Sequence, residues 1–321
     1  MTAPHIHPIF GYLLGMAIEG LWSVMGEPAP LNIVEFGAGD GTLGKQLIDA
    51  LPGVPVRYTA AERSPGARAL LEDFAFAVTD GFDEGLASCK GIFLANELLD
   101  NLPSRLLRGK PGGAVELLVD WDRQAERFVT VERPVPIEIA EIAPAVEPGD
   151  EVVVSLEALR FIDRLAGLML DGYAILIDYG GSGAHPPHGY RGQRHVEDIL
   201  QAPGTCDITA GVDFDALVER AQQLRFRVFG PVSQHDALLQ LGFARWLDAQ
   251  RSEQRSLLAE GQGRKAVEAW SDRVAAQLLV DPAGLGRFRW LVLGAPDMPP
   301  PPWTLPLERP QRAAARPNDI R

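Results

Sequence analysis

The stretch IVEFGAGDGTLGKQL, residues 33–47, is the feature that most limits what this chain can fold into. An apolar run containing one acid, Glu35, leads into glycines at every second position, Gly37, Gly39 and Gly41, and then into a helical pattern. A buried strand, a glycine turn and a helix are typical of the first strand-to-helix connection of an open α/β sheet. Ligands of such sheets bind beyond the carboxyl ends of the strands, so the glycine turn marks the expected binding edge.

Strand and helix patterns alternate along most of the chain. The predicted strands are 31–37, 56–62, 75–80, 91–97, 173–180, 226–230 and 287–294, and the predicted helices are 8–25, 42–51, 64–74, 155–170, 213–224 and two or three within 234–280. This alternation predicts a doubly wound, mostly parallel, Rossmann-like α/β sheet with extra C-terminal helices.

Three segments depart from the alternation. Residues 105–150 contain two alternating runs that predict a hairpin inserted on the sheet, followed by a proline-punctuated loop. Residues 181–205 are rich in Gly, Pro and His and predict a long loop. The Pro- and Arg-rich residues 297–321 predict a disordered tail. We therefore expect one domain over 1–296, with an insertion at about 105–150, and a tail over 297–321.

Composition excludes several classes of function. The net charge of −13 argues against a general binder of nucleic acid or of anionic membranes, which would need a basic surface. The apolar run at 10–22 is too short to cross a bilayer and contains Glu19, so we expect no membrane insertion. The two cysteines, Cys89 and Cys206, have no metal-ligand spacing and suggest a reduced compartment. We expect a soluble cytoplasmic protein without a metal site.

The glycine turn has the spacing G-x-G-x-G, which is neither the dinucleotide fingerprint G-x-G-x-x-G nor a P-loop. The second strand ends in Glu62, where an acid can hold ribose hydroxyls, and the third ends in Asp80, beside the expected adenine. Together these features predict an adenosine ligand without a pyrophosphate, and S-adenosylmethionine fits best. The alternative is that the glycines form ordinary turns and the two acids are surface residues.

The segment LANELLDNLPSRLL, residues 94–107, follows the fourth strand and carries Asn96, Glu97 and Asp100. Transfer of a methyl group from a sulfonium needs alignment more than acid–base power. Carboxylates contribute when the acceptor is a guanidinium, because they orient it and can take up its proton. We interpret the three residues as catalytic. The alternative is that Asn96 or Asp100 caps a following helix.

Seven blocks of the sequence resemble the MidA-type S-adenosylmethionine-dependent methyltransferases, whose mitochondrial members methylate an arginine of a respiratory complex I subunit and assist its assembly. The blocks are TAPHIHPIFGYLLG, VEFGAGDGTLGKQL, AERSPGARALL, LANELLDNLP, LIDYGG, PGTCDITAGVDFDAL and SQHDALLQLGF, which cover most of residues 2–243 in the family order. The resemblance implies a class I methyltransferase fold, S-adenosylmethionine as cofactor and a protein partner that carries an arginine.

The resemblance also implies roles for individual residues. It places cofactor contacts at Gly37, Gly39, Gly41 and Glu62, with Glu35 and Asp80 expected beside them, and an active-site role at Asn96, Glu97 and Asp100. The residues expected to bind substrate are Asp178, Tyr179, His195 and Asp207.

The sequence departs from the family in two ways. Gly211 stands where the family has a histidine, and family members carry a further segment before the first block. Both departures leave room for a different acceptor. A small-molecule O- or N-methyltransferase and a catalytically weakened assembly or binding factor therefore remain alternatives to a protein arginine methyltransferase. An NAD-dependent dehydrogenase is disfavoured by the glycine spacing, and the oligomeric state stays open.

Overall fold

The computed structural model describes residues 2–74, 76–81, 86–182, 187–191, 194–196, 198–201 and 204–304. The chain divides into two compact units. The first, which we call the sheet unit, comprises Met1–Asn96, Gly167–Ile177 and Arg225–Arg321. The second, the insert unit, comprises Glu97–Ala166 and Asp178–Leu224.

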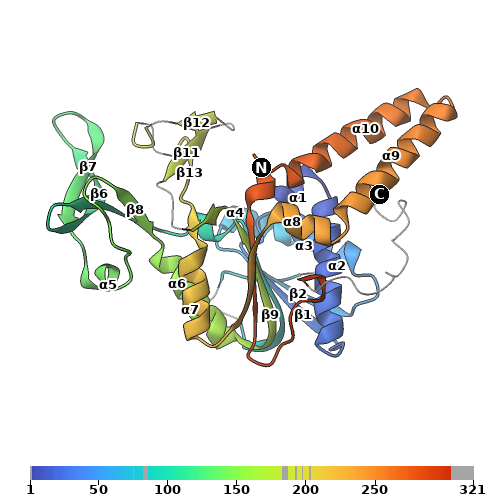
Figure 1. The fold of residues 1–321 in the computed structure, drawn as a ribbon, viewed down its shortest axis with the longest axis horizontal. Coiled ribbons are helices and arrows are strands. Elements are labelled where there is room, and N and C mark those ends of the chain that lie inside the picture. Colours follow the sequence, from blue (N-terminus) through green and yellow to red (C-terminus); the bar gives the residue numbers. More distant parts are fainter. Residues whose placement is uncertain are drawn as a thin grey trace. The chain divides into compact units, whose positions relative to one another are not determined.

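A seven-stranded sheet in the order β15-β16-β9-β4-β1-β2-β3 forms the centre of the sheet unit (Figure 1). Its strands are β1 (Leu31–Phe36), β2 (Val56–Ala61), β3 (Ala77–Thr79), β4 (Cys89–Asn96), β9 (Met169–Asp178), β15 (Arg227–Ser233) and β16 (Arg289–Gly294). The pairs β1–β2, β1–β4, β2–β3 and β4–β9 are parallel, whereas β15 and β16 are antiparallel. The predicted mostly parallel α/β sheet is thus confirmed. Because β1 pairs with β2 on one side and β4 on the other, the strand order reverses at the glycine turn.

Helices α2 (Ile9–Val24) and α3 (Thr42–Ala50) pack closely on each other beside the buried core of this sheet. Glycines in α2 permit this approach, since a Cβ on Gly11 would lie 2.4 Å from Gln46 Cβ and one on Gly15 would lie 2.6 Å from Ala50 Cβ. The short helix α1 (Ala3–Ile6) precedes α2, and α4 (Pro65–Leu71) connects β2 to β3. The bounds of α2 and α3 match the predicted helices 8–25 and 42–51 to within one residue at each end.

Three further helices follow β15: α8 (Gln234–Gln240), α9 (Phe243–Ala259) and α10 (Gly263–Gln277). Figure 1 shows α9 and α10 side by side as a hairpin. Short 3-10 turns follow at η2 (Leu278–Val280), η3 (Leu285–Arg287) and η4 (Pro302–Thr304). The predicted tail lies outside the described residues from 305 onward. None of the helices within the described ranges is long and apolar enough to cross a membrane.

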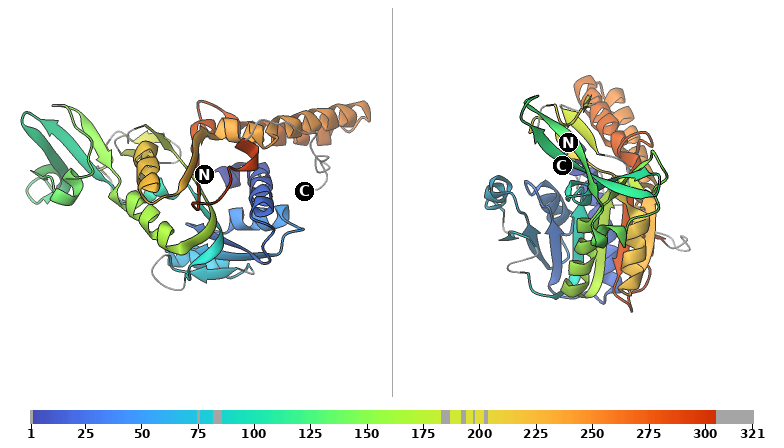
Figure 2. Two further views of the ribbon diagram at one scale, coloured as in Figure 1. Left: turned by 60° about the horizontal axis from the view of Figure 1, so that its bottom comes forward. Right: turned by 90° about the vertical axis from the view of Figure 1, so that its left-hand side faces the viewer.

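The insert unit contains a four-stranded antiparallel sheet in the order β7-β6-β5-β8 (Figure 2). The strands are β5 (Arg105–Lys110), β6 (Gly113–Asp122), β7 (Arg127–Pro134) and β8 (Glu151–Val154), with α5 (Ile137–Ala140) between the last two. The predicted hairpin corresponds to β6 and β7 and is confirmed. The prediction does not include β5 and β8. Strand β5 has few apolar residues, and β8 is a short edge strand that follows a proline-rich loop.

The remaining elements of the insert unit are helices and short strands. They are η1 (Leu99–Asn101), α6 (Leu156–Leu168), β10 (Gly180–Gly181), β11 (His188–Arg191), β12 (Arg194–Val196), β13 (Asp207–Thr209), β14 (Val212–Asp213) and α7 (Phe214–Gln223). Strands β12, β11 and β13 form a small sheet, so the prediction of a long loop over 181–205 is wrong at β11 and β12. Strands of three or four residues with Gly and Arg carry no alternating apolar signal.

Candidate functional site

The glycine turn after β1 has the backbone conformation that its sequence predicts. Gly37, Gly39 and Gly41 have φ values of 70°, 57° and 81°, in the left-handed region that glycine tolerates best. A Cβ on Gly41 would lie 2.8 Å from the ring of Phe74, so this position is closed by packing. A Cβ on Gly39 would meet no described atom within 4 Å. The turn therefore leaves a bare backbone surface at Gly39.

Glu62 is fixed against this bare surface. The Gly39 amide donates a hydrogen bond to Glu62 Oε2 at 2.9 Å, and the Ser64 amide donates one to Oε1 at 2.8 Å. Each carboxylate oxygen keeps a second lone pair that a ligand hydroxyl can use. The structure thus brings together the loop and the acid that were expected to contact one cofactor. Their role as ligands stays a prediction.

A pair that the sequence did not reveal braces the glycine turn. His5 Nε2 lies 2.9 Å from Asp40 Oδ2, and the Thr42 amide donates to Asp40 Oδ1 at 3.1 Å. Burial raises the pKa of Asp40, but the hydrogen bonds from His5 and Thr42 outweigh it and lower the pKa below its usual value. His5 and Asp40 are 35 residues apart, and no sequence pattern links them.

Glu35 lies behind the glycine turn, on the core side of β1. Its side chain is 3% exposed, and Tyr58 donates its hydroxyl hydrogen to Oε2 at 2.6 Å. Burial raises the pKa of Glu35 to about 8, although the Tyr58 hydrogen bond acts in the opposite direction. The hydrogen bond from the buried Tyr58 holds the Glu35 side chain in the core behind the glycine turn. The expected contact of Glu35 with the cofactor stays a prediction.

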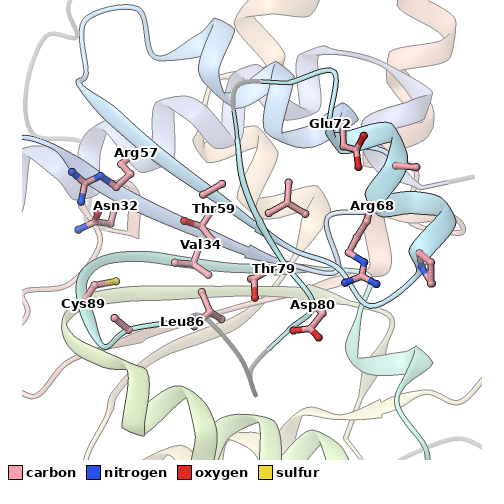
Figure 3. Close-up of a pocket in the computed structure, with 15 residues that line it drawn as sticks. Asn32, Val34, Arg57, Thr59, Arg68, Glu72, Thr79, Asp80, Leu86 and Cys89 are labelled. Atoms are coloured by element: carbon pink, nitrogen blue, oxygen red, sulfur yellow. The ribbon is translucent and has the colours of Figure 1, made fainter.

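A cavity of about 990 Å³ lies against one face of the strands in the sheet unit (Figure 3). Its floor includes Asn32 and Val34 of β1 and Thr59 of β2, and α4 contributes Arg68 and Glu72. Of the predicted site residues, Asp80 alone lines it, and the glycine turn and Glu62 do not. The cavity runs from the end of β3 toward the starts of the strands, so it extends away from the predicted cofactor edge.

In the insert unit, the Asp178 carboxylate accepts backbone hydrogen bonds from a segment almost 80 residues earlier in the chain and from the residue that follows it. Its Oδ2 accepts from the Leu99 amide at 2.7 Å and from the Asp100 amide at 3.3 Å, and its Oδ1 accepts from the Tyr179 amide at 2.8 Å. The side chain is 0% exposed. Asp178, the last residue of β9, therefore holds the turn η1 in place.

Asp100 lies in this turn and is held on both of its oxygens. The Thr209 hydroxyl donates to Oδ2 at 2.6 Å, and the side-chain Nδ2 of Asn101 donates to Oδ1 at 2.7 Å. Burial raises the pKa of Asp100 and of Asp178, and for Asp178 the neighbouring Asp100 carboxyl raises it further. Two neighbouring buried carboxyls disfavour ionising together, so each of them binds a proton more readily than a carboxyl in water does.

The alternative of a helix cap at Asn96 or Asp100 is wrong. Asp100 is inside η1, whose N-cap Leu98 makes no side-chain capping bond, and the next described element is β5. Glu97 has a φ of 52°, which a residue other than glycine adopts at a cost and which is common at functional sites. The strained backbone at Glu97 supports a functional interpretation of this segment.

Three expected site residues are placed less completely. Tyr179 directly follows β9, while His195 and Asp207 belong to β12 and β13 by their backbones. The side chains of His195 and Asp207 lie outside the described part of the structure, so their roles stay predictions. Thr209, two residues after Asp207, contacts Asp100 across 109 residues of sequence, and only the family block containing it pointed to this region. No group of three or more His, Cys, Asp or Glu within the described ranges could hold a metal ion.

Comparison with known proteins gives consistent matches. Residues 13–232 match the model of a family described as "Putative S-adenosyl-L-methionine-dependent methyltransferase". The Danio rerio protein named "Protein arginine methyltransferase NDUFAF7, mitochondrial" is 29% identical over 280 residues, covering 75% of this chain and 66% of that protein. The Homo sapiens protein of the same name is 30% identical over 284 residues, covering 75% and 63%. The chain thus spans just under two thirds of the length of these relatives.

Two solved structures from Burkholderia thailandensis share the fold. One is 26% identical, with a TM-score of 0.76, and covers 92% of this chain and 81% of that one. The other is bound to S-adenosyl-homocysteine and is 25% identical, with a TM-score of 0.75, covering 92% and 78%. The similarity therefore includes a structure that holds the demethylated form of the predicted cofactor.

Proposed function

Because the chain belongs to the family of S-adenosyl-L-methionine-dependent methyltransferases, we propose that it transfers the methyl group of this cofactor to an arginine of a protein partner. The observation that carries the proposal is the hydrogen bond that fixes Glu62 against the bare backbone of Gly39, at the edge where the strand order reverses. That combination suits a ligand that has ribose hydroxyls and no pyrophosphate.

The residues of the sheet unit fit S-adenosylmethionine. Gly39 offers an uncovered backbone for the methionine end, and Glu62 offers free lone pairs to the ribose hydroxyls. When bound, the cofactor supplies a methyl carbon made electrophilic by its sulfonium sulfur. The chain's own contribution is to hold and orient, since the displacement needs alignment more than proton transfer.

Two observations support arginine as the acceptor. The curated relatives are named protein arginine methyltransferases, although this chain spans less than two thirds of their length. The insert unit also presents the half-buried carboxyl of Asp100, which as a carboxylate accepts hydrogen bonds and whose pKa is raised by burial, so that it binds a proton more readily. A guanidinium needs both features from its binding site, namely an anionic acceptor of its hydrogen bonds and a group that takes its proton. The cytoplasmic location stays a prediction, and the curated relatives are named mitochondrial.

The test has two stages. The first is calorimetric titration of the full chain with S-adenosylmethionine and S-adenosyl-homocysteine, beside the variants Gly39→Val and Glu62→Ala. We expect binding by the parent chain and loss of binding in both variants. Glu19→Ala removes an exposed acid of α2 and should bind as the parent does. Failure of the parent to bind either compound would overturn the cofactor assignment.

The second stage identifies the acceptor. Cell extract is incubated with the chain and cofactor carrying an isotopically labelled methyl group, and mass spectrometry locates the label. We expect label on arginine side chains of a protein. Label on small molecules alone would replace the proposal by a small-molecule methyltransferase. Tight cofactor binding with no labelled product of either kind would favour a binding or assembly factor.

A further inference from the structure

Asp178 cannot act by touching a substrate, because its side chain is fully buried. Both of its oxygens are occupied by backbone amides, two of which belong to Leu99 and Asp100, almost 80 residues earlier in the chain. A buried carboxyl with three amide donors fixes backbone geometry. What it fixes is the turn that carries Asp100.

We propose that Asp178 is a positioning residue for the proposed methyl transfer, which holds η1 so that Asp100 takes up the proton leaving the substrate nitrogen. This inference rests on the proposed function and replaces the expected substrate contact of Asp178. Asp100 is the member of the pair that reaches the surface, since it is half-buried whereas Asp178 is not exposed at all. Asp100 therefore contacts the substrate, and Asp178 acts through it.

Thr209 completes the arrangement from the other side. Its hydroxyl donates to Asp100 Oδ2, while the Asn101 side chain donates to Oδ1. These two hydrogen bonds fix the orientation of the Asp100 carboxyl group. Asp100 and Asp178 are the carboxyls that these bonds hold, and Thr209 and Asn101 are neutral donors. Glu97 and Tyr179 are the further titratable residues whose backbones bond to this cluster. A proton acceptor needs a fixed position more than it needs strong basicity, because misplacement by about 1 Å lowers the rate by about two orders of magnitude.

The proton balance of the step is simple. A guanidinium nitrogen forms a bond to the methyl carbon, the bond from that carbon to sulfur breaks, and its electron pair remains on sulfur. The methylated nitrogen then carries one proton too many. This proton passes to a carboxylate oxygen of Asp100, and the protonated Asp100 later releases it to water.

The main test compares Asp178→Asn with the parent chain, using N-acetyl-Gly-Arg-Gly-amide as acceptor probe. The asparagine must turn its NH₂ group either toward the Leu99 and Asp100 amides or toward the Tyr179 amide, so at least one of the three hydrogen bonds is lost, and the neutral amide oxygen is a weaker acceptor for those that remain. We expect unchanged cofactor binding, a similar KM for the probe, a fall in kcat of about a hundredfold and an altered pH dependence of kcat. Asp213→Asn, a helix-cap change at α7 in the same unit, should leave kcat unchanged.

A second pair of variants separates positioning from general damage. Thr209→Val removes the donor to Asp100 and should lower kcat, whereas Thr209→Ser keeps the hydroxyl and should restore most of it. Parent-like kcat and pH dependence in Asp178→Asn would overturn the inference. Equal losses in Thr209→Ser and Thr209→Val would contradict the role given to the hydroxyl.

Two measurements that need no catalysis, NMR titration and hydrogen exchange, test the inference without knowledge of the acceptor. In the full chain labelled with [4-¹³C]aspartate, the Asp100 and Asp178 carboxyl signals should titrate together, above the usual range for aspartate, and Asp178→Asn should expose the Leu99 and Asp100 amides to faster hydrogen exchange. If the probe is not methylated but these results are found, the proposed acceptor fails and the positioning of Asp100 stands. If the signals titrate separately and the amides stay protected in Asp178→Asn, the inference fails even where the probe is methylated.

Discussion

Replacing Glu35 by glutamine should change how the stability of the protein depends on pH. Glu35 is almost completely buried beside the glycine turn, and its only described hydrogen bond is the one donated by Tyr58 at 2.6 Å. The glutamine side chain keeps an oxygen that can accept from Tyr58 and has nearly the same shape. The substitution therefore removes the titration of this side chain with little change in packing.

The magnitude follows from the shift in pKa. Burial raises the pKa of Glu35 from 4.5 to about 8, so the folded protein binds an extra proton between these values. The stabilising contribution is fully present below pH 4.5 and is lost as the pH rises through 8. At about 1.4 kcal/mol per pKa unit, the parent chain loses up to about 5 kcal/mol of unfolding free energy across this window because of Glu35.

The assay is urea unfolding of the parent and Glu35→Gln at pH values from 4.5 to 9. We expect the difference in unfolding free energy between the two proteins to move in favour of the variant as the pH rises, by up to about 5 kcal/mol. Glu19→Gln, at an exposed acid of α2, controls for the loss of one formal charge. Parallel curves for the parent and Glu35→Gln would refute the argument that Glu35 is neutral in the folded protein.

Three further predictions use other contacts. Tyr58→Phe removes the hydrogen bond that lowers the pKa of Glu35, so the pH window of stability loss should move upward in the same urea experiment. Gly41→Ala places a Cβ 2.8 Å from Phe74 at a φ of 81° and should destabilise the chain by about 1–3 kcal/mol, measured by thermal unfolding. Arg105→Met leaves the buried Glu116 without its partner at 2.7 Å; we expect a loss of about 1–3 kcal/mol and faster hydrogen exchange in β5 and β6, with the central sheet unchanged as internal control.

The sequence predicts the central sheet well because its signals are local. Buried parallel strands are short apolar runs bounded by turn residues. A helix such as α4 carries its own start signal, with Ser64 as its N-cap and Pro65 as its first residue. The small strands of the insert unit lack such signals. Strand β11 is held by pairing with β12 on one side and β13 on the other, which is a property of the assembled unit and not of its own residues.

In the candidate site, too, some residues could be predicted from the sequence and others could not. The acids at the ends of β2 and β9, Glu62 and Asp178, follow from the rule that ligands gather at the carboxyl ends of parallel strands. The hydrogen-bond partners of the site acids cannot be predicted from this rule. The contacts of Glu62 with Gly39, of Asp40 with His5 and of Asp100 with Thr209 join residues 23, 35 and 109 positions apart, and one sequence alone gives no measure of such distances.

The same rule treats all strand-end acids alike, whereas the structure separates them by environment. Glu62 is partly exposed and receives two backbone N–H bonds, so it suits a charged acceptor for ligand hydroxyls. Glu35 is buried with one neutral donor, and burial keeps it protonated near neutral pH. The formal charge of −13 therefore overstates the negative charge of the folded chain. What matters for a cationic cofactor or a guanidinium is which carboxyl can be reached, and on these grounds the acids to test first are the partly exposed Glu62 and Asp100.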